Sequence, residues 1–133
     1  APLLDLPRGR LELAPGGKLQ LALLRGGPWE GNEGSRTLEV RFEGRRLLLS
    51  GDAEMQGLAA MLQAGLLQGP VDILLLPHHG SHTPHLAPLL EATRPREVWV
   101  SCSGRPPTAD ELERLGLPWR ATGVHGWLQT PGR

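Results

Sequence analysis

The sequence has a single cysteine, no long apolar run and no excess of either charge. With Cys102 alone, an internal disulfide is excluded, and the redox compartment stays undecided. A formal net charge of zero gives no global attraction to nucleic acid or to a membrane surface. No stretch approaches the roughly 20 apolar residues that span a bilayer, and no signal peptide is visible. The length suits one domain, residues 1–133, and the absence of an initial methionine suggests a segment of something longer.

The apolar and polar pattern predicts strands first, and then alternating helices and strands. Apolar and polar residues alternate from Thr37 to Phe42, with the period of two that is typical of a half-buried strand. Strands are expected at residues 11–13, 19–24, 37–42, 45–50, 71–76, 97–101, 119–122 and 126–129, and helices from Asp52 to about residue 66, from 83 to 93 and from 108 to 115. We therefore predict an α/β (α+β) fold, a mixed β-sheet with helices on one face.

Histidine is absent before residue 78, and four of the five histidines then fall within eight positions. His78 and His79 directly follow an apolar strand, and Asp52 follows the preceding one. One strand–helix–strand unit separates Asp52 from His79, so a right-handed crossover would return both to the same edge of the sheet. Neutral imidazole is a common metal ligand, and Gly80 allows a sharp turn there. The spacing predicts a metal site at this edge.

Each of these residues also has an ordinary structural interpretation. Asp52 lies between a strand and a helix, where aspartate is a good N-cap. Ser81 can bond its own backbone in a turn. His82 and His85 could bind metal as an i, i+3 pair, but solvated positions around a helix start are the favoured interpretation. The pairing of Asp52 with the two adjacent histidines, more than any single residue, favours the metal site.

Two blocks of the chain resemble the metallo-β-lactamase-like hydrolases. Residues 46–54, RLLLSGDAE, resemble the block "rhLLTGDae", in which Asp52 matches the aspartate that bridges two metal ions. Residues 71–81, VDILLLPHHGS, are similar to "aDvLkvpHHGS", a wording most characteristic of the hydrolase domain of ComEC-type DNA-internalisation competence proteins. His79 matches the position expected to bind metal there, with His78 as the alternative.

The resemblance covers about residues 30–130 and is incomplete. The HxHxDH metal motif expected well upstream of Asp52 is absent, as is a further ligand histidine between that motif and Asp52. Residues 103–107 lack the asparagine and histidine of the usual segment, and Gly-Val-His at 123–125 replaces an expected aspartate. The resemblance thus implies the carboxy-terminal half of an αβ/βα sandwich.

The family implies a metal-bound hydroxide that attacks a phosphodiester, with zinc or manganese as the metal. A catalytic site of this kind needs about three protein ligands and an open position, whereas Asp52 and His79 supply two. Two ligands can complete a metal site whose other ligands come from elsewhere, but they cannot form such a site alone. Ser81, Arg45 and Arg46 are the candidate substrate-binding residues. For the two arginines, solvated charges at a strand end are the favoured alternative.

Three functions stay open for the parent protein. The first is a nuclease or phosphodiesterase acting in DNA uptake, as a soluble domain of a bacterial cytoplasmic-membrane protein. Its partners would be DNA, the missing amino-terminal half of the hydrolase domain and a membrane channel domain. The second is a non-catalytic docking module of a DNA transporter, and the third is a small-molecule hydrolase such as a thioesterase or lactonase. The chain alone is expected to be inactive, and to bury an exposed apolar surface in a homodimer.

Overall fold

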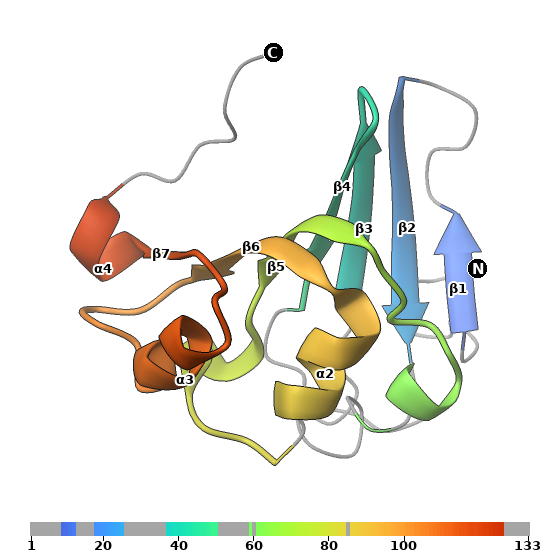
Figure 1. The fold of residues 1–133 in the computed structure, drawn as a ribbon. Helices are drawn as coiled ribbons and strands as arrows, with labels where there is room; N and C mark the ends of the chain where they lie inside the picture. The colour runs from blue at the N-terminus through green and yellow to red at the C-terminus, as the bar shows by residue number, and fades with distance from the viewer. Residues whose placement is uncertain are drawn as a thin grey trace.

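The computed structural model describes residues 9–12, 18–25, 37–50, 59, 61–84 and 86–126, without the side chains of residues 9–12, 25, 78 and 79. In this part of the chain, seven strands form one sheet whose spatial order is the sequence order (Figure 1). They are β1 (Gly9–Glu12), β2 (Leu19–Arg25), β3 (Thr37–Phe42), β4 (Arg45–Leu49), β5 (Val71–Leu75), β6 (Pro95–Val100) and β7 (Trp119–Ala121). Strands β1 to β4 pair antiparallel, and β4 to β7 pair parallel. The predicted mixed sheet is confirmed.

A tight hairpin joins β3 to β4. Phe42 is the register partner of Arg45, which leaves Glu43 and Gly44 as a two-residue loop. Both loop residues have positive φ, 50° and 78°, the conformation that matches the right-handed twist of a two-residue hairpin. The turn fixes which residues of β3 and β4 share a face of the sheet.

The helices connect the parallel strands. Helix α2 (Leu86–Thr93) lies between β5 and β6, α3 (Ala109–Arg114) lies between β6 and β7, and residues 59 and 61–63, between β4 and β5, are also helical. Successive parallel strands advance across the sheet in one direction, so right-handed crossovers place their helices on one face. Among the described residues, no helix has the length and hydrophobicity needed to cross a membrane.

The core lies between these helices and the sheet. Leu89 of α2 and Leu112 of α3 belong to one buried cluster with Leu48, Leu74 and Val98, which come from three neighbouring strands. All five side chains have no exposed surface. The prediction of helices packed on one face of a mixed sheet is therefore confirmed.

The end of the described chain contains a short helix that the sequence did not predict. Strand β7 pairs with β6 in parallel, and the chain then forms the short helix α4 (Thr122–His125). The Thr122 hydroxyl accepts the N–H of Cys102 and donates to its carbonyl, both at 3.2 Å, which draws the chain toward the loop after β6. Apart from Gly126, which is not in a strand, the strand expected at 126–129 lies outside the described residues.

The two faces of the sheet differ in what covers them. Helices α2 and α3 cover one face, and the strand registers place alternate residues on the other. None of the described helices packs against this second face, and we call the apolar residues there the open face. These residues are Leu19, Leu21, Leu23, Leu38, Val40, Phe42, Leu47, Leu49, Leu75 and Trp99, which are half-buried or exposed, and Ile73, which is buried.

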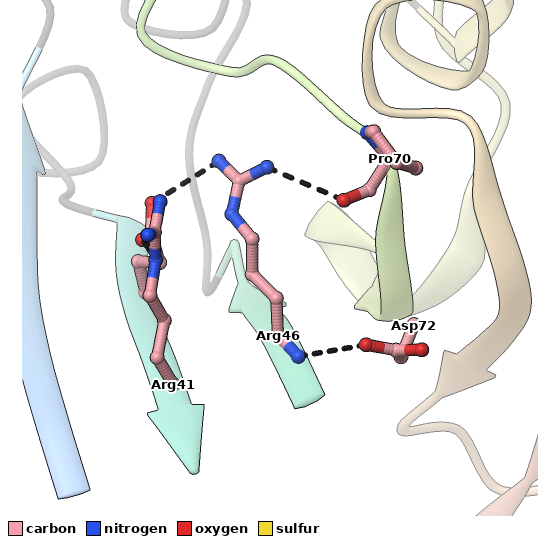
Figure 2. Close-up of polar contacts among 5 residues, drawn as sticks. Arg41, Arg46, Pro70 and Asp72 are labelled. Atoms are coloured by element: carbon pink, nitrogen blue, oxygen red, sulfur yellow. Dashed lines mark hydrogen bonds and ion pairs between the residues drawn. The ribbon is translucent and has the colours of Figure 1, made fainter. Parts of the chain in front are cut away.

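A buried carboxylate links the starts of β4 and β5 to β3. Glu39 has no exposed surface, and its carboxylate lies 2.5 Å from Nε of Arg41 and 3.2 Å from Nη2 of Arg46. Arg46 also donates from Nη1 to the carbonyl of Pro70 at 3.4 Å, and from its backbone N–H to Oδ2 of Asp72 at 2.8 Å (Figure 2). Burial penalises an unpaired charge, so the contacts with these arginines stabilise the buried Glu39 carboxylate.

Replacing Arg46 should destabilise the fold more than replacing Arg41. Arg46→Met is expected to lower the free energy of unfolding by about 3 kcal/mol, because it weakens the pairing of a buried carboxylate. Arg41→Met is the matched control, with an expected loss of about 1 kcal/mol, since that side chain is 50% exposed. The double variant Glu39→Met with Arg46→Met should recover most of the loss. Urea denaturation measures all three, and equal losses for the two arginine variants would contradict this account.

Candidate functional site

Strands β4 and β5 end at the same edge of the sheet, which we call the carboxyl edge. Leu49 is the register partner of Leu75, and the N–H of Ser50 donates to the carbonyl of Leu75 at 3.4 Å. After β5 the chain enters the 3-10 turn η3 (Pro77–Gly80), whose two central residues are the adjacent histidines. Asp52 follows Ser50 by two positions. The segments that lead to the candidate ligands thus leave the sheet side by side, as the crossover argument predicts.

The ligand side chains themselves are not placed. Asp52 lies outside the described residues, and for His78 and His79 only the backbone of the turn is described. The convergence of the carboxylate and an imidazole in one cleft therefore stays a prediction. Of the predicted geometry, the structure shows that the two strands end at the same edge of the sheet.

Gly80 fixes the position of the histidine turn. Its φ is +77°, and a Cβ there would lie 2.6 Å from Cγ1 of Val100 and 3.1 Å from Cβ of Pro106. Its carbonyl accepts a hydrogen bond from the hydroxyl of Thr108 at 2.8 Å. Thr108 precedes α3 but makes no side-chain cap to that helix. The turn is thus clamped against β6 and the start of α3.

Two polar residues at the carboxyl edge were missed by sequence reasoning. Val100 and Ala121, the last residues of β6 and β7, are register partners, so Cys102 and Thr122 follow two adjacent strand ends. The signal was available, because Thr122 directly follows β7 and Cys102 follows the end of β6 by two positions. The Cys102 thiol donates to the carbonyl of Gly104 at 2.9 Å, and its backbone is bonded to Thr122. These contacts order the loop after β6.

The described residues do not by themselves form a metal site. No group of three or more His, Cys, Asp or Glu side chains placed to hold an ion occurs in the described part of the chain. This absence does not concern Asp52 or the side chains of the two turn histidines, which lie outside the described part of the chain. A zinc-like catalytic site needs about three protein ligands, so the assignment of Asp52 and His79 as two of them stays a prediction.

Ser81 and His82 lie directly after the histidine turn. Both side chains are exposed, which places them in solvent beside the carboxyl edge. His85, the partner of His82 in the alternative i, i+3 pair, lies outside the described residues. A role of Ser81 in substrate binding stays a prediction.

Arg45 and Arg46 lie at the opposite end of β4 from the carboxyl edge. Arg45 and Leu49 are the first and last residues of the strand, so about 13 Å separates their Cα atoms at roughly 3.3 Å per residue. The guanidinium of Arg46 binds Glu39 and the Pro70 carbonyl. A contact of either arginine with substrate stays a prediction, and it would occur at a distance from the candidate ligands.

The resolved pKa shifts among the described residues belong to an exposed network around α3. A hydrogen bond from Arg105 and a second from the indole of Trp119 lower the pKa of Glu113. Hydrogen bonds to Glu113 and Asp110 raise the pKa of Arg105. About half of the Arg105 and Glu113 side chains is exposed. Structural ion pairs shift pKa values without catalysis, so we assign this network to the packing of α3 on β7.

Comparison with known proteins identifies a fold and no closer relationship. No protein-family model matches this sequence, and no curated protein sequence matches it. Among solved structures, a variant of the CmlA β-hydroxylase is similar, with a TM-score of 0.58 and 13% identity over 84% of this chain. That protein has the metallo-β-lactamase fold, and this chain spans 31% of its length. At this identity the likeness shows the fold alone.

Gly80→Ala should destabilise the chain more than the same change at Gly116. Both glycines have a similar positive φ, +77° and +74°, but a Cβ at Gly116 meets nothing within 4 Å. We expect Gly116→Ala to cost about 1 kcal/mol of unfolding free energy, from the left-handed conformation alone. Gly80→Ala should cost about 3 kcal/mol, because overpacking against Val100 is added. Thermal and urea denaturation would show the difference, and equal costs would mean that the turn is not clamped.

Proposed function

We propose that this chain is the carboxy-terminal part of a metal-dependent hydrolase domain that acts on phosphodiester bonds. The observation that carries the proposal is the parallel pairing of β4 with β5, which brings the segment before Asp52 and the histidine turn to one edge. Ligands at such an edge can converge on one crevice. The likeness to a metallo-β-lactamase-fold enzyme supports a hydrolase-like fold of the metal-dependent kind.

In this proposal Asp52 and His79 hold the metal, with His78 as the alternative ligand. A bound zinc or manganese ion would supply Lewis-acid stabilisation of charge on a phosphoryl oxygen. The chain's own task is to present its ligands from a rigid frame, and the clamp between Gly80 and Thr108 serves that purpose. Ser81, exposed after the turn, is the proposed contact to the phosphate near the metal.

The remaining ligands and the substrate follow from the same proposal. An amino-terminal half of the domain would provide the missing histidines, because two ligands cannot fix coordination geometry. DNA is the proposed substrate, on the resemblance to ComEC-type proteins carried by residues 46–54 and 71–81. The corresponding location is a soluble domain of a bacterial cytoplasmic-membrane protein, beside its channel domain. Arg45 and Arg46 would then contact a phosphate remote from the metal.

The open face favours a second candidate, a non-catalytic docking module of a membrane DNA transporter. A broad apolar surface is a common property of proteins that bind other proteins. In this alternative Asp52 caps the helix that follows it, and the histidine turn is structural. The two candidates differ in one measurable property, the metal dependence of bond cleavage.

Plasmid cleavage with added Mn²⁺ or Zn²⁺ tests the proposal on this chain and on the parent domain that includes upstream residues. The 133-residue chain should not cut DNA and should bind these metals weakly, because it supplies too few ligands. The parent domain should cleave, and Asp52→Ala or His79→Ala should lower the rate about 100-fold or more. His82→Ala is the matched control, an exposed histidine three positions after His79 that should leave the rate unchanged.

Each other outcome has a defined meaning. Robust cleavage by the 133-residue chain would contradict the incomplete site. A parent domain that is inactive with both metals would contradict the hydrolase and support the docking module. Hydrolysis of thioesters or lactones, without DNA cleavage, would support a small-molecule hydrolase of the same superfamily. A loss of activity in His82→Ala equal to that in His79→Ala would contradict the assignment of the ligand histidine.

A further inference from the structure

Two buried hydroxyl groups of the core have no hydrogen-bond partner among the described residues. They are Oγ1 of Thr37, at the start of β3, and Oγ of Ser50, directly after β4. Both residues have no exposed surface. A buried polar group without a partner costs free energy, so buried hydroxyls are normally bonded to protein or to an ordered water. The two groups therefore indicate a binding partner that the described side chains do not supply.

The two hydroxyls lie opposite each other on neighbouring strands. Leu38 and Leu49 are register partners in the antiparallel pair, so Thr37 and Ser50, the next residue on each strand, face each other. The N–H of Ser50 donates to the carbonyl of Leu75 and so points away from β3. Opposite residues whose N–H groups point away from each other form the closer type of pair, with Cβ atoms about 4.5–5.5 Å apart. The side chains of Thr37 and Ser50 are thus direct neighbours.

The row of residues that contains them is otherwise apolar. Leu24 of β2 is the register partner of Thr37, and Leu76 follows the residue whose carbonyl binds the N–H of Ser50. Leu24 and Leu76 both belong to the buried cluster between the sheet and the helices. Neither leucine side chain can donate or accept a hydrogen bond. The two hydroxyls thus form an isolated polar pair on the covered face of the sheet.

A single water molecule fits the chemistry of this pair. A hydroxyl both donates and accepts, and a water bound in a core typically bonds two to four groups that are otherwise unpaired. Oxygens on two Cβ atoms about 5 Å apart can both lie within hydrogen-bond distance of one water between them. The row has no charged side chain that would hold an ion. Glu39, the next residue of β3 on this face, is paired with Arg41 and Arg46.

We infer that Thr37 and Ser50 form a binding site for one ordered water at the carboxyl edge of the sheet. The water links β3 to β4 beyond the last paired residues of the two strands. Ser50 is bonded on its other side to β5, so the site fixes the end of β4 between both of its neighbours. The site lies directly before the segment that leads to Asp52. The inference does not depend on a metal there, and it stands without the proposed hydrolase activity.

Magnetic relaxation dispersion of the water signal tests the inference on the 133-residue chain, because it counts internal waters that exchange slowly. Thr37→Val with Ser50→Ala should reduce this number by one relative to the original chain. Thr37→Ser keeps a hydroxyl and should retain the water. The matched control is Thr93→Val, which removes an equally buried hydroxyl that is already bonded to the Leu89 carbonyl at 2.7 Å. This control should leave the number of internal waters unchanged.

Urea denaturation of the same variants separates a bound water from two unpaired hydroxyls. Thr37→Val and Ser50→Ala should each lower the folding equilibrium constant about fivefold, because each removes one partner of the water. The double variant should lose less than the product of the two single losses, since both substitutions remove the same water. Hydroxyls that are unpaired would give the opposite result, because their removal leaves the stability unchanged or raises it.

Three results would overturn the inference. The first is an unchanged number of internal waters in the double variant, which would mean that the hydroxyls bond each other or another part of the chain. The second is a pair of single variants at least as stable as the original chain. The third is the loss of a water in Thr93→Val as well, which would indicate a general loosening of the core. If the double variant does not fold, Thr37→Val should lose the water that Thr37→Ser keeps, and equal numbers in these two would count against the site.

Discussion

The parallel pairing of β4 with β5 is the interaction on which the rest of the structure depends. Before β4 the chain runs as an antiparallel meander, and after it every strand runs in the same direction and ends at the carboxyl edge. The register is fixed at the start of the pair, where Arg46 binds the Pro70 carbonyl and the Asp72 carboxylate. A shift of one residue would reverse which side chains face the helices. Contacts at the start of the two strands thus set the register, and the register determines where the segments that lead to the candidate ligands begin.

The burial of Glu39 and the apolar residues of the open face have the same origin in the sequence of β3. Because β3 places Glu39 on the covered side, that carboxylate has to be paired inside the protein, and Arg46 provides the pairing. The same alternation places Leu38, Val40 and Phe42 on the open side. In a strand with one face in water, the polar residues normally lie on the open side and the apolar residues on the covered side. The internal ion pair and the exposed apolar residues are therefore two consequences of one alternation in sequence.

Local patterns predicted most of the strands, whereas contacts between distant residues decided the differences. The period of two in Thr37–Phe42 predicted β3 with its observed bounds, and the continuous apolar run predicted β5. The short helix α4 was not predicted, and it begins at Thr122, whose bonds to Cys102, 20 positions earlier, no local pattern contains. Thr108 likewise bonds the carbonyl of Gly80, 28 positions away, whereas the sequence predicted only that a helix begins at this residue. At the site, the sequence predicted the shared edge, whereas Asp52 and the side chain of His79 lie outside the described part of the chain.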